Sequence, residues 1–539
     1  MSKCLLRAFF PVLVLSSSLA ASEKLIRFER FELPNGLGVI LSEDHASPVV
    51  SYAVYYNVGS SNEVRGRTGF AHLFEHMMFQ GSQNVPRNMH HLWIGRAGGN
   101  DNGSTNQDRT NYFATLPSNQ LEIALWLESD RMKALNITQE NFENQRSTVK
   151  EEKRQSYDNQ PYSEGRSRLY ELVFEAFPYQ HTVIGSMQDL DAAELKDVQA
   201  FFDTYYAPNN AVLSVVGDIN PSEARKLIEK YFGPIPARVP PPLVVISEPE
   251  RVREKKMTVR DKYANLPALF VGYGIPRRGH PDNDALELLG DILFSGESAR
   301  LYQKLVKEKE AAVSVSGGAS AMRGAGIFSF NLMIKRDRKP EEVLQTALDE
   351  IEKVRQTPVS AEELEKAKNR ARSAMIARLE RTLNRALALC EYELLDGDAG
   401  RVNSALDRMA AVTTADLARV AKKYLTPRNR SSVIVLPASF KAADDSFRKN
   451  VPFSNIATQY RFPISKEKVL GNGLYVQAFE DRSLPRVTIQ FYLKGGAYYE
   501  PPDKPGIGTL VAGLMREGTK SFPGKLIQEK LDALGAAVD

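Results

Sequence analysis

Hydrophobic and polar residues alternate along the first part of the chain with two different periods, and each period predicts an element. In "FERFELPNGLGVILSED" (28–44) the alternation continues on both sides of Asn35-Gly36, which is typical of two strands joined by a tight turn. Segment 49–59 predicts a further strand, whereas 70–80 has apolar residues at helical spacing and no internal proline or glycine. The same criteria predict strands at 111–117 and 209–219 and helices at 120–135, 141–157 and 221–233.

Strands and helices mixed in this order indicate an α+β fold rather than a strictly alternating parallel sheet. We expect repeated two-layer α/β-sandwich domains, each a mostly antiparallel sheet with helices on one face. The proline-dense stretch 233–250 is typical of a linker, which predicts a first domain at 23–240 and a second at 247–437. Pro208 and Pro427 each follow a predicted helix and precede a strand, so we expect a similar fold for both domains.

A repeat begins near the C-terminus. The constant shift that places Asn35 on Asn472 aligns "NGLGVILSED" with "NGLYVQAFED" without a gap. Matching glycines indicate matching backbone conformations, so the second copy should repeat the strands and helix of the first. Where the first copy has "HLFEH" (72–76), the second has "TLVAG" (509–513), so we expect the scaffold without the ligands. The aligned pairs are Gly59 and Gly496, Glu63 and Glu500, Gly69 and Gly506, Gly81 and Gly518, and Pro86 and Pro523.

The second copy reaches Asp539, well short of a full repeat of what precedes it. We therefore expect residues 438–464 to form a linker and 465–539 to be the start of an incomplete, degenerate repeat of the first domain. On this interpretation the protein has two domains per half and the second half is truncated. The alternative is a short strand–helix cap that ends the chain by design.

Composition excludes one class of partner and indicates a compartment. The chain is 42% hydrophobic and 25% charged with a net charge of +4, and no dense Lys/Arg block favours nucleic acid. Residues 1–22 have Lys3 and Arg7, then an apolar run and small residues, which is typical of a secretory signal peptide. The run is too short to cross a bilayer, so we expect no stable membrane span. The mature protein is expected to be exported to the periplasm, with secretion as the alternative.

The segment "HLFEH" (72–76) is the candidate for chemistry. Residues four apart on a helix share a face, so His72 and His76 can present ring nitrogens to one metal ion. Glu75 lies near that face and can hold a water molecule without binding the ion. Catalytic zinc takes three protein ligands and acidifies a water molecule to a pKa of about 7, and a nearby carboxylate accepts the proton. The pattern predicts such a centre, with two helix histidines in ordinary hydrogen bonds as the alternative.

A third ligand is needed, and Glu152 is the candidate. In "NFENQRSTVKEEKRQSY" (141–157) it lies on the helical stripe with the more apolar composition, where a carboxylate needs a cation or a donor. Glu151 is the second choice and lies on a stripe of polar residues that is typical of a solvated surface. His90 and His91 are further possible ligands, but adjacent helix residues point about 100° apart, so at most one of them can serve.

With these residues identified, 27–240 resembles the catalytic domain of the pitrilysin-type, or inverzincin, metallopeptidases. That family includes insulin-degrading enzyme and the mitochondrial processing peptidase. Its motif is His-x-x-Glu-His followed, at a characteristic distance along the chain, by a glutamate ligand. Counted from His76, that distance ends at Glu152. The resemblance implies that His72, His76 and Glu152 bind zinc and that Glu75 is the general base.

The resemblance extends to "GGNDNGSTNQDRTNYFATLP" (98–117) and "SARLYQKLVKEKE" (298–310). It implies that the first of these segments forms an edge strand beside the metal, to which a substrate adds as another strand. Asn102 takes the position of a family asparagine near the substrate backbone, or is a turn residue beside Gly103. The chain differs from many members in having Gln145 where they have a further glutamate beside the metal ligands.

The resemblance implies an exported bacterial zinc metalloendopeptidase that acts on extended peptides or unfolded polypeptides. It further implies that a second half, from the same chain or from a homologous subunit, completes a chamber around the substrate. The alternative is a non-catalytic structural or substrate-holding subunit of a peptidase complex. A purely structural zinc site is disfavoured because such a site has four protein ligands and no adjacent base.

Overall fold

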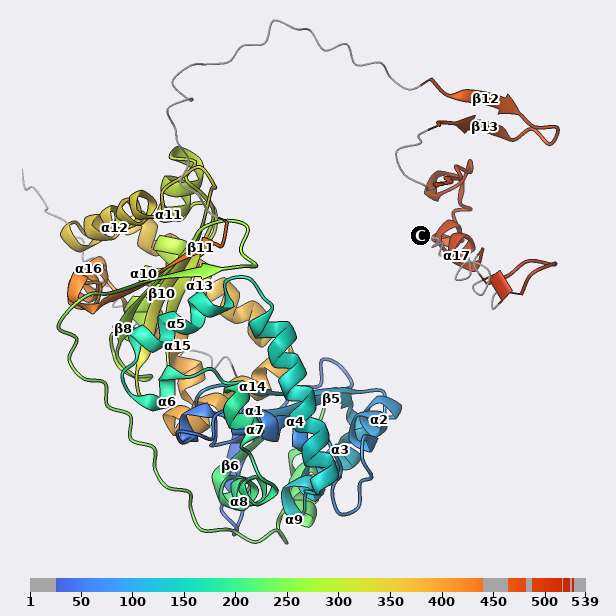
Figure 1. Cartoon of the computed structure of the whole chain (residues 1–539). Helices are drawn as coiled ribbons and strands as arrows, with labels where there is room; N and C mark the ends of the chain where they lie inside the picture. The colour runs from blue at the N-terminus through green and yellow to red at the C-terminus, as the bar shows by residue number, and fades with distance from the viewer. Residues whose placement is uncertain (1–25, 440–463, 481–486, 516, 524–525, 528–539) are drawn as a thin grey trace, which may run out of the picture. The chain divides into compact units, whose positions relative to one another are not determined.

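The structure is a computed structural model that describes residues 26–439, 464–480, 487–515, 517–523 and 526–527 (Figure 1). The chain divides into two compact units, one up to residue 446 and one from residue 447. The signal peptide predicted at 1–22 and nearly all of the linker predicted at 438–464 lie outside the described residues. In the part of the chain that the structure describes, no helix is long and apolar enough to cross a membrane.

The alternating segments between Glu29 and Gly217 form a six-stranded sheet. Its order is β1-β2-β6-β3-β5-β4, in which β2 and β6 run parallel and the other neighbours run antiparallel. β4 pairs with β5 alone and is therefore a free edge. The strands are β1 Glu29–Glu32, β2 Gly38–Glu43, β3 Val49–Tyr56, β4 Asn100–Thr105, β5 Thr110–Pro117 and β6 Ala211–Gly217.

One face of this sheet is covered by helices from the same part of the chain, and the apolar side chains between them form its main core. The predicted helix at 120–135 is α3, but it is buried along most of its length rather than amphipathic. Glu128 and Arg131 are buried in it because they pair with each other, and Glu128 also accepts a 2.7 Å hydrogen bond from Tyr52. The helices are α1 Phe70–Met77, α2 Met89–Arg96, α3 Leu121–Lys133, α4 Gln139–Lys153, α7 Met187–Asp191, α8 Leu195–Tyr205 and α9 Pro221–Phe232.

A second sheet has the order β7-β11-β8-β10-β9, with β7 and β11 parallel. This order and these strand directions repeat β2-β6-β3-β5-β4 of the first sheet, so the two parts share a fold. The turns at Pro208 and Pro427 precede the equivalent strands β6 and β11. The strands are β7 Lys255–Asp261, β8 Ala268–Ile275, β9 Ala312–Ala321, β10 Gly326–Ile334 and β11 Arg430–Pro437. The helices on one face are α10 Asn283–Phe294, α11 Arg300–Tyr302, α12 Pro340–Gln356, α13 Ala361–Leu379 and α16 Thr414–Tyr424. A further helix, α15 Arg401–Ala411, contributes Val402 to a core on the first sheet.

Each sheet also receives a helix from the other domain on its second face, which the sequence pattern did not indicate. α14 (Thr382–Asp396) packs on the first sheet through Leu389 and Cys390, and the Cys390 thiol donates to the Ala53 carbonyl at 3.3 Å. α5 (Ser163–Val173) and α6 (Phe177–Gln180) pack on the second sheet. The two domains predicted from the linker position therefore share cores on these faces.

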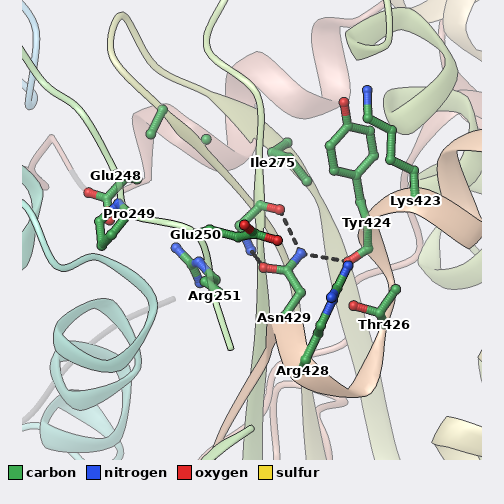
Figure 2. Close-up of a pocket in the computed structure, with 13 residues that line it drawn as sticks. Glu248, Pro249, Glu250, Arg251, Ile275, Lys423, Tyr424, Thr426, Arg428 and Asn429 are labelled. Atoms are coloured by element: carbon green, nitrogen blue, oxygen red, sulfur yellow. Dashed lines mark hydrogen bonds between the residues drawn. The ribbon is translucent and has the colours of Figure 1, made fainter. Parts of the chain in front are cut away.

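The predicted linker connects the two sheets as a segment without helix or strand, drawn as a long green coil in Figure 1. At its end a cavity of about 300 Å³ lies where residues 248–251 pass β8 and the turn before β11 (Figure 2). Asn429 closes one side, because its amide donates to the carbonyls of Gly274 and Tyr424 at 2.8 and 2.6 Å. This cavity contains none of the candidate site residues, so it belongs to the anchoring of the linker.

The second unit repeats the element order of the first copy. β12 (Lys466–Val469) pairs antiparallel with β13 (Tyr475–Ala478), and α17 spans Ile507–Leu514. Under the shift that places Asn35 on Asn472, these bounds coincide with those of β1, the first part of β2, and α1. Residues 487–493 align with β3 but form no strand.

Candidate metal centre

Helix α1 presents its two histidines on the side that the core leaves free. Its apolar side chains pack into the first core, whereas His72, Glu75 and His76 stay partly accessible. The helix begins after Gly69, which has a φ of +90°. The buried Glu63 carboxylate accepts hydrogen bonds from the backbone N–H groups of Gly69 and Ala71 at 2.9 and 2.8 Å, so it satisfies donors that a helix N-terminus otherwise leaves unpaired.

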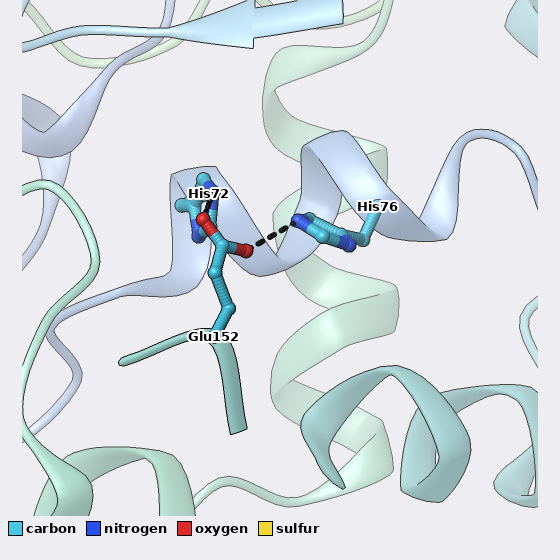
Figure 3. A group of neighbouring side chains, drawn as sticks. All are labelled: His72, His76 and Glu152. Atoms are coloured by element: carbon cyan, nitrogen blue, oxygen red, sulfur yellow. Dashed lines mark ion pairs between the residues drawn. The ribbon is translucent and has the colours of Figure 1, made fainter. Parts of the chain in front are cut away.

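Helix α4 brings Glu152 to the same place from a distant part of the sequence. The stripe that contains Phe142, Gln145 and Val149 is buried, and Glu152 extends that stripe to the end of the helix. A π-helical turn at Arg154–Asp158 follows at once, which is a feature that often occurs near functional sites. The Glu152 side chain is 36% exposed, and its carboxylate points at both histidines (Figure 3).

The three donor groups converge with spacings that suit a metal ion. Glu152 Oε1 lies 3.7 Å from His72 Nε2, and Glu152 Oε2 lies 3.2 Å from His76 Nε2. One donor atom from each residue lies within 4.8 Å of the others, and no other such group occurs among the described residues. Two ligand atoms about 2.0–2.1 Å from a tetrahedral zinc ion are roughly 3.4 Å apart, so these residues fit zinc.

Local electrostatics favour the ligand form of these side chains. Burial, with a smaller effect from His76, lowers the pKa of His72 to about 4, so its ring is neutral at pH 7 and keeps a lone pair for a metal. The hydrogen bond to His76 lowers the pKa of Glu152, which keeps the carboxylate charged. His72 Nδ1 is buried without a hydrogen-bond partner, so the described protein groups engage this ring from its Nε2 side only.

Glu75 lies on the same helix but bonds in a different direction. Its carboxylate accepts a 2.6 Å hydrogen bond from the Thr105 hydroxyl of β4 instead of joining the three ligands. Burial raises the pKa of Glu75, and the bond from Thr105 opposes that rise. Gly103 of β4 leaves room for the side chain, because a Cβ there would lie 3.2 Å from Glu75 Cγ.

The other candidate ligands lie elsewhere. Glu151 points into solvent, where it pairs with Arg154 at 3.0 Å and is 54% exposed. His90 and His91 both approach Asp101 of β4, with His91 Nδ1 2.9 Å from Asp101 Oδ1. These two histidines therefore hold the edge strand in place and are not part of the donor group.

Asn102 is exposed on the edge strand β4, as the resemblance implied for its segment. Its side-chain oxygen accepts a 2.8 Å bond from the backbone N–H of Gly103. Gln145 is buried and donates to Asn144 at 2.7 Å, so its amide is engaged within α4.

Sequence reasoning missed two residues that hold this site. Thr105 has a detectable signal, because Asp101, Gly103 and Thr105 are spaced by two and must share a face of a strand. The sequence signal for Glu63 is clearer, since this glutamate recurs as Glu500 in the second copy, which has no counterparts of His72 and His76. A residue that persists there has a task in the scaffold rather than in metal binding.

Comparison with known proteins gives the family. The model of the insulinase (peptidase family M16) domain matches residues 38–186, and the model of the peptidase M16 inactive domain matches residues 192–371. The first match contains α1 and α4, and the second contains four of the five strands of the second sheet. The second match begins within the first sheet's part of the chain, since it also contains β6 and the helices α8 and α9.

Individual relatives agree with this assignment. The zinc protease PqqE of Helicobacter pylori is 28% identical over 431 residues, 79% of this chain and 96% of that protein. The mitochondrial-processing peptidase subunit beta of Lentinula edodes is 23% identical, with 73% of this chain and 86% of that protein covered. The crystal structure of a protease from Helicobacter pylori is similar with a TM-score of 0.74 and 29% identity, over 76% of this chain and all of that one. The chain belongs to the M16, or pitrilysin, family of peptidases.

Proposed function

We propose that this protein is a zinc-dependent endopeptidase that hydrolyses peptide bonds in extended peptides or unfolded polypeptides. The observation that carries the proposal is the convergence of His72, His76 and Glu152 within 4.8 Å, beside a carboxylate that does not join them. Three ligands and a neighbouring base are the composition of a catalytic zinc site, whereas a structural site has four ligands. The names of the relatives, which are zinc proteases, support the same choice of metal.

The proposed chemistry assigns one role to each side chain. Zinc held by His72, His76 and Glu152 would polarise a water molecule and the substrate carbonyl. Glu75 accepts one proton from the water as the water oxygen bonds to the carbonyl carbon. The carbon–nitrogen bond then breaks, and the same proton passes from Glu75 to the leaving nitrogen. Proton and electron pairs balance without any further reactant, and the products are a carboxylic acid and an amine.

Two features support an extended polypeptide as the substrate. β4 is an edge strand of its sheet and carries Asn102, so a peptide can pair with it as an additional strand. A cavity of about 780 Å³ lies alongside the end of α4, with Lys153 and Tyr157 in its wall. It is open and lined by both acidic and basic side chains, which favours broad acceptance of sequences over one charged residue.

We further propose that a second half completes the site, supplied by the same chain or by a homologous subunit. The support is the repeat in the second unit, where α17 has the bounds of α1 under the shift that places Asn35 on Asn472. Apolar side chains of α17 are exposed where those of α1 are buried, so α17 needs a covering partner; the pairs are Leu510 and Leu73, Val511 and Phe74, and Leu514 and Met77.

We propose export to the periplasm on the evidence of the N-terminal sequence. The basic residues, apolar run and small residues of 1–22 support cleavage before residue 23. N-terminal sequencing of the protein recovered from a periplasmic extract tests this directly. A start near residue 23 is the expected result, and an intact Met1 in the cytoplasmic fraction would contradict it.

Cleavage of an internally quenched, unstructured peptide by the complete zinc-loaded protein tests the enzymatic proposal. Chelation should abolish cleavage and added zinc should restore it. Glu75→Gln should lower cleavage by about 10²- to 10⁴-fold, since an amide cannot accept the proton, while zinc stays near one per chain. Glu223→Gln, an exposed carboxylate at the start of α9, is the control and should have no effect.

Two outcomes would contradict the enzymatic proposal. Unchanged cleavage in Glu75→Gln would remove the general base from the mechanism. No cleavage of any peptide by the complete zinc-loaded protein would instead favour the non-catalytic, substrate-holding role. Peptide binding without turnover would then be the property to measure.

A further inference from the structure

One face of the edge strand β4 contacts the helices α1 and α2. Asp101, Gly103 and Thr105 alternate along the strand and so share a face. Asp101 is held by His91 of α2, Gly103 leaves space for the Glu75 side chain, and Thr105 donates its hydroxyl proton to Glu75 Oε2 at 2.6 Å.

We propose that Thr105 is a positioning residue for the Glu75 carboxylate and that β4 thereby fixes the direction in which this carboxylate points. The proposal rests on the proposed function, in which Glu75 is the general base. It adds that the strand at which a substrate would pair also holds the base.

The hydrogen bond from Thr105 is the one hydrogen bond that Glu75 accepts in the described part of the chain. No Lys or Arg forms an ion pair with its carboxylate among these residues, and Arg109 acts on it only through longer-range attraction. The last torsion of a glutamate side chain is broad, so without Thr105 nothing in the described residues would fix the two oxygens. With Oε2 engaged, Oε1 keeps its lone pairs for a water molecule.

The Thr105 hydroxyl has a defined direction because the neighbouring Thr110 hydroxyl already donates its proton elsewhere. Thr110 lies opposite Thr105 in the β4–β5 ladder, with 3.3 Å between the two hydroxyl oxygens. Thr110 donates its own proton to the Val58 carbonyl at 2.9 Å, so it offers Thr105 no proton. The Thr105 proton is therefore free to go to Glu75, which is the stronger, charged acceptor.

The far end of the strand is anchored independently of Glu75. The Asp101 side chain is 7% exposed and lies between His90 and His91, at 3.6 and 2.9 Å. Phe79, which follows α1, stacks on the His91 ring with 4.3 Å between ring centres. α1, α2 and β4 therefore form one contact network, and a shift of β4 changes the place of the Thr105 hydroxyl.

Thr105→Val tests the proposal, because valine keeps the branched shape that suits a strand and removes the hydroxyl. We expect kcat to fall by about 10- to 100-fold with KM within about twofold, as a misplaced catalytic group costs rate more than binding. Zinc content should stay near that of the parent. Thr105→Ser restores the hydroxyl and should recover most of kcat.

Thr115→Val is the matched control, since it removes a hydroxyl of the same sheet that bonds to Ser51 at 2.8 Å and not to Glu75. It should leave kcat unchanged. A loss of kcat in Thr115→Val equal to that in Thr105→Val would assign the effect to general weakening of the sheet and overturn the proposal. Unchanged kcat in Thr105→Val with an active parent would overturn it as well.

Crystal structures of the metal-free parent and of metal-free Thr105→Val give a readout that does not depend on activity. The parent should show Glu75 Oε2 about 2.6 Å from Thr105 Oγ1, and the variant should show Glu75 displaced or in several rotamers. A Glu75 side chain that keeps its place in the variant would refute the positioning role. An inactive parent in which Glu75 still moves would leave this inference standing while the proposed function fails.

Discussion

The Glu63 carboxylate accepts a 2.8 Å hydrogen bond from the backbone N–H of Ala71, and at the aligned position of the second copy Glu500 accepts the same bond from Gly508 at 2.8 Å. The bond holds the first turn of α1, which carries His72 and His76, and in the second copy it holds the first turn of the equivalent helix α17. The second copy keeps the bond although "HLFEH" has become "TLVAG". The carboxylate therefore serves the start of the helix in both copies, whether or not the helix carries the two histidines.

Glu63→Gln should destabilise the first unit by about 1–3 kcal/mol, the range for leaving a buried polar group without its partner. The amide N–H groups of the new glutamine would face the backbone N–H groups that Glu63 now accepts from, so two donors would meet. The site is buried, as the raised pKa of Glu63 reflects, so no water molecule can accept from these donors instead. Chemical denaturation of the metal-free protein measures the cost. Glu500→Gln is the control at the exposed copy and should leave the stability of the first unit unchanged.

Gly69→Ala should be far more costly than Gly66→Ala, although both glycines have a positive φ, at +90° and +82°. A side chain at Gly66 meets nothing within 4 Å, so it pays only the conformational cost of about 1–2 kcal/mol. At Gly69 the new Cβ would lie 2.6 Å from the Ile184 carbonyl oxygen, which should add at least about 1–3 kcal/mol. Equal unfolding midpoints for the two variants would contradict this prediction and would show that the backbone at Ile184 can move away at no cost.

Glu152→Gln should weaken zinc binding on the order of 100-fold or more, because even partners of metal ligands contribute about 10- to 100-fold. Glu151→Gln is the matched control on the same helix and should bind zinc like the parent, since Glu151 pairs with Arg154 at the surface. Competition with a chromogenic zinc chelator measures both affinities. If Glu151→Gln lost the metal and Glu152→Gln kept it, the ligand assignment would be reversed.

The sequence carried the parts of the site that depend on local periodicity. His72 and His76 are four apart on α1. Helix periodicity alone favoured Glu152 over Glu151, because only Glu152 continues the three- and four-residue spacing of the buried stripe of α4. Strand alternation likewise predicted the turn at Asn35-Gly36, where Gly36 has a φ of +83°.

Contacts between distant segments were beyond the sequence pattern. α14 packs on the first sheet and α5 packs on the second. The apolar stripe of a helix shows that the helix is buried on one side, but it does not show which sheet it packs against. Periodicity predicted the helix at 120–135 but not the burial of its charged residues, since Arg131 is buried only because it pairs with Glu128 three residues away. Thr105 reaches Glu75 only because β4 folds back on α1, a relationship that a single sequence does not state.

The ion pair between Arg300 and Glu363 should make the stability of the second sheet's helices depend on pH. Two hydrogen bonds of 2.7 Å join the guanidinium to the carboxylate, and they lower the pKa of Glu363 from 4.5 to about 2. Because the folded pKa is below the unfolded one, the contribution is complete above pH 4.5 and is lost as the pH falls towards 2. Both side chains are about a quarter exposed, so we expect about 1 kcal/mol at pH 7.

Glu363→Gln isolates that contribution, since the glutamine side chain can still accept from the Ser360 backbone N–H, and the backbone N–H of residue 363 can still donate to the Ser360 hydroxyl. Denaturation midpoints of the metal-free parent and variant should differ at pH 7 and converge as the pH is lowered from 5 to about 2.5, because the parent then loses its charge. Metal-free protein is used so that zinc release at low pH does not enter the comparison. Glu362→Gln, at the exposed neighbouring position, should show no such pH-dependent gap. A Glu363→Gln gap that stayed constant across this range would assign the stabilisation to packing rather than to charge.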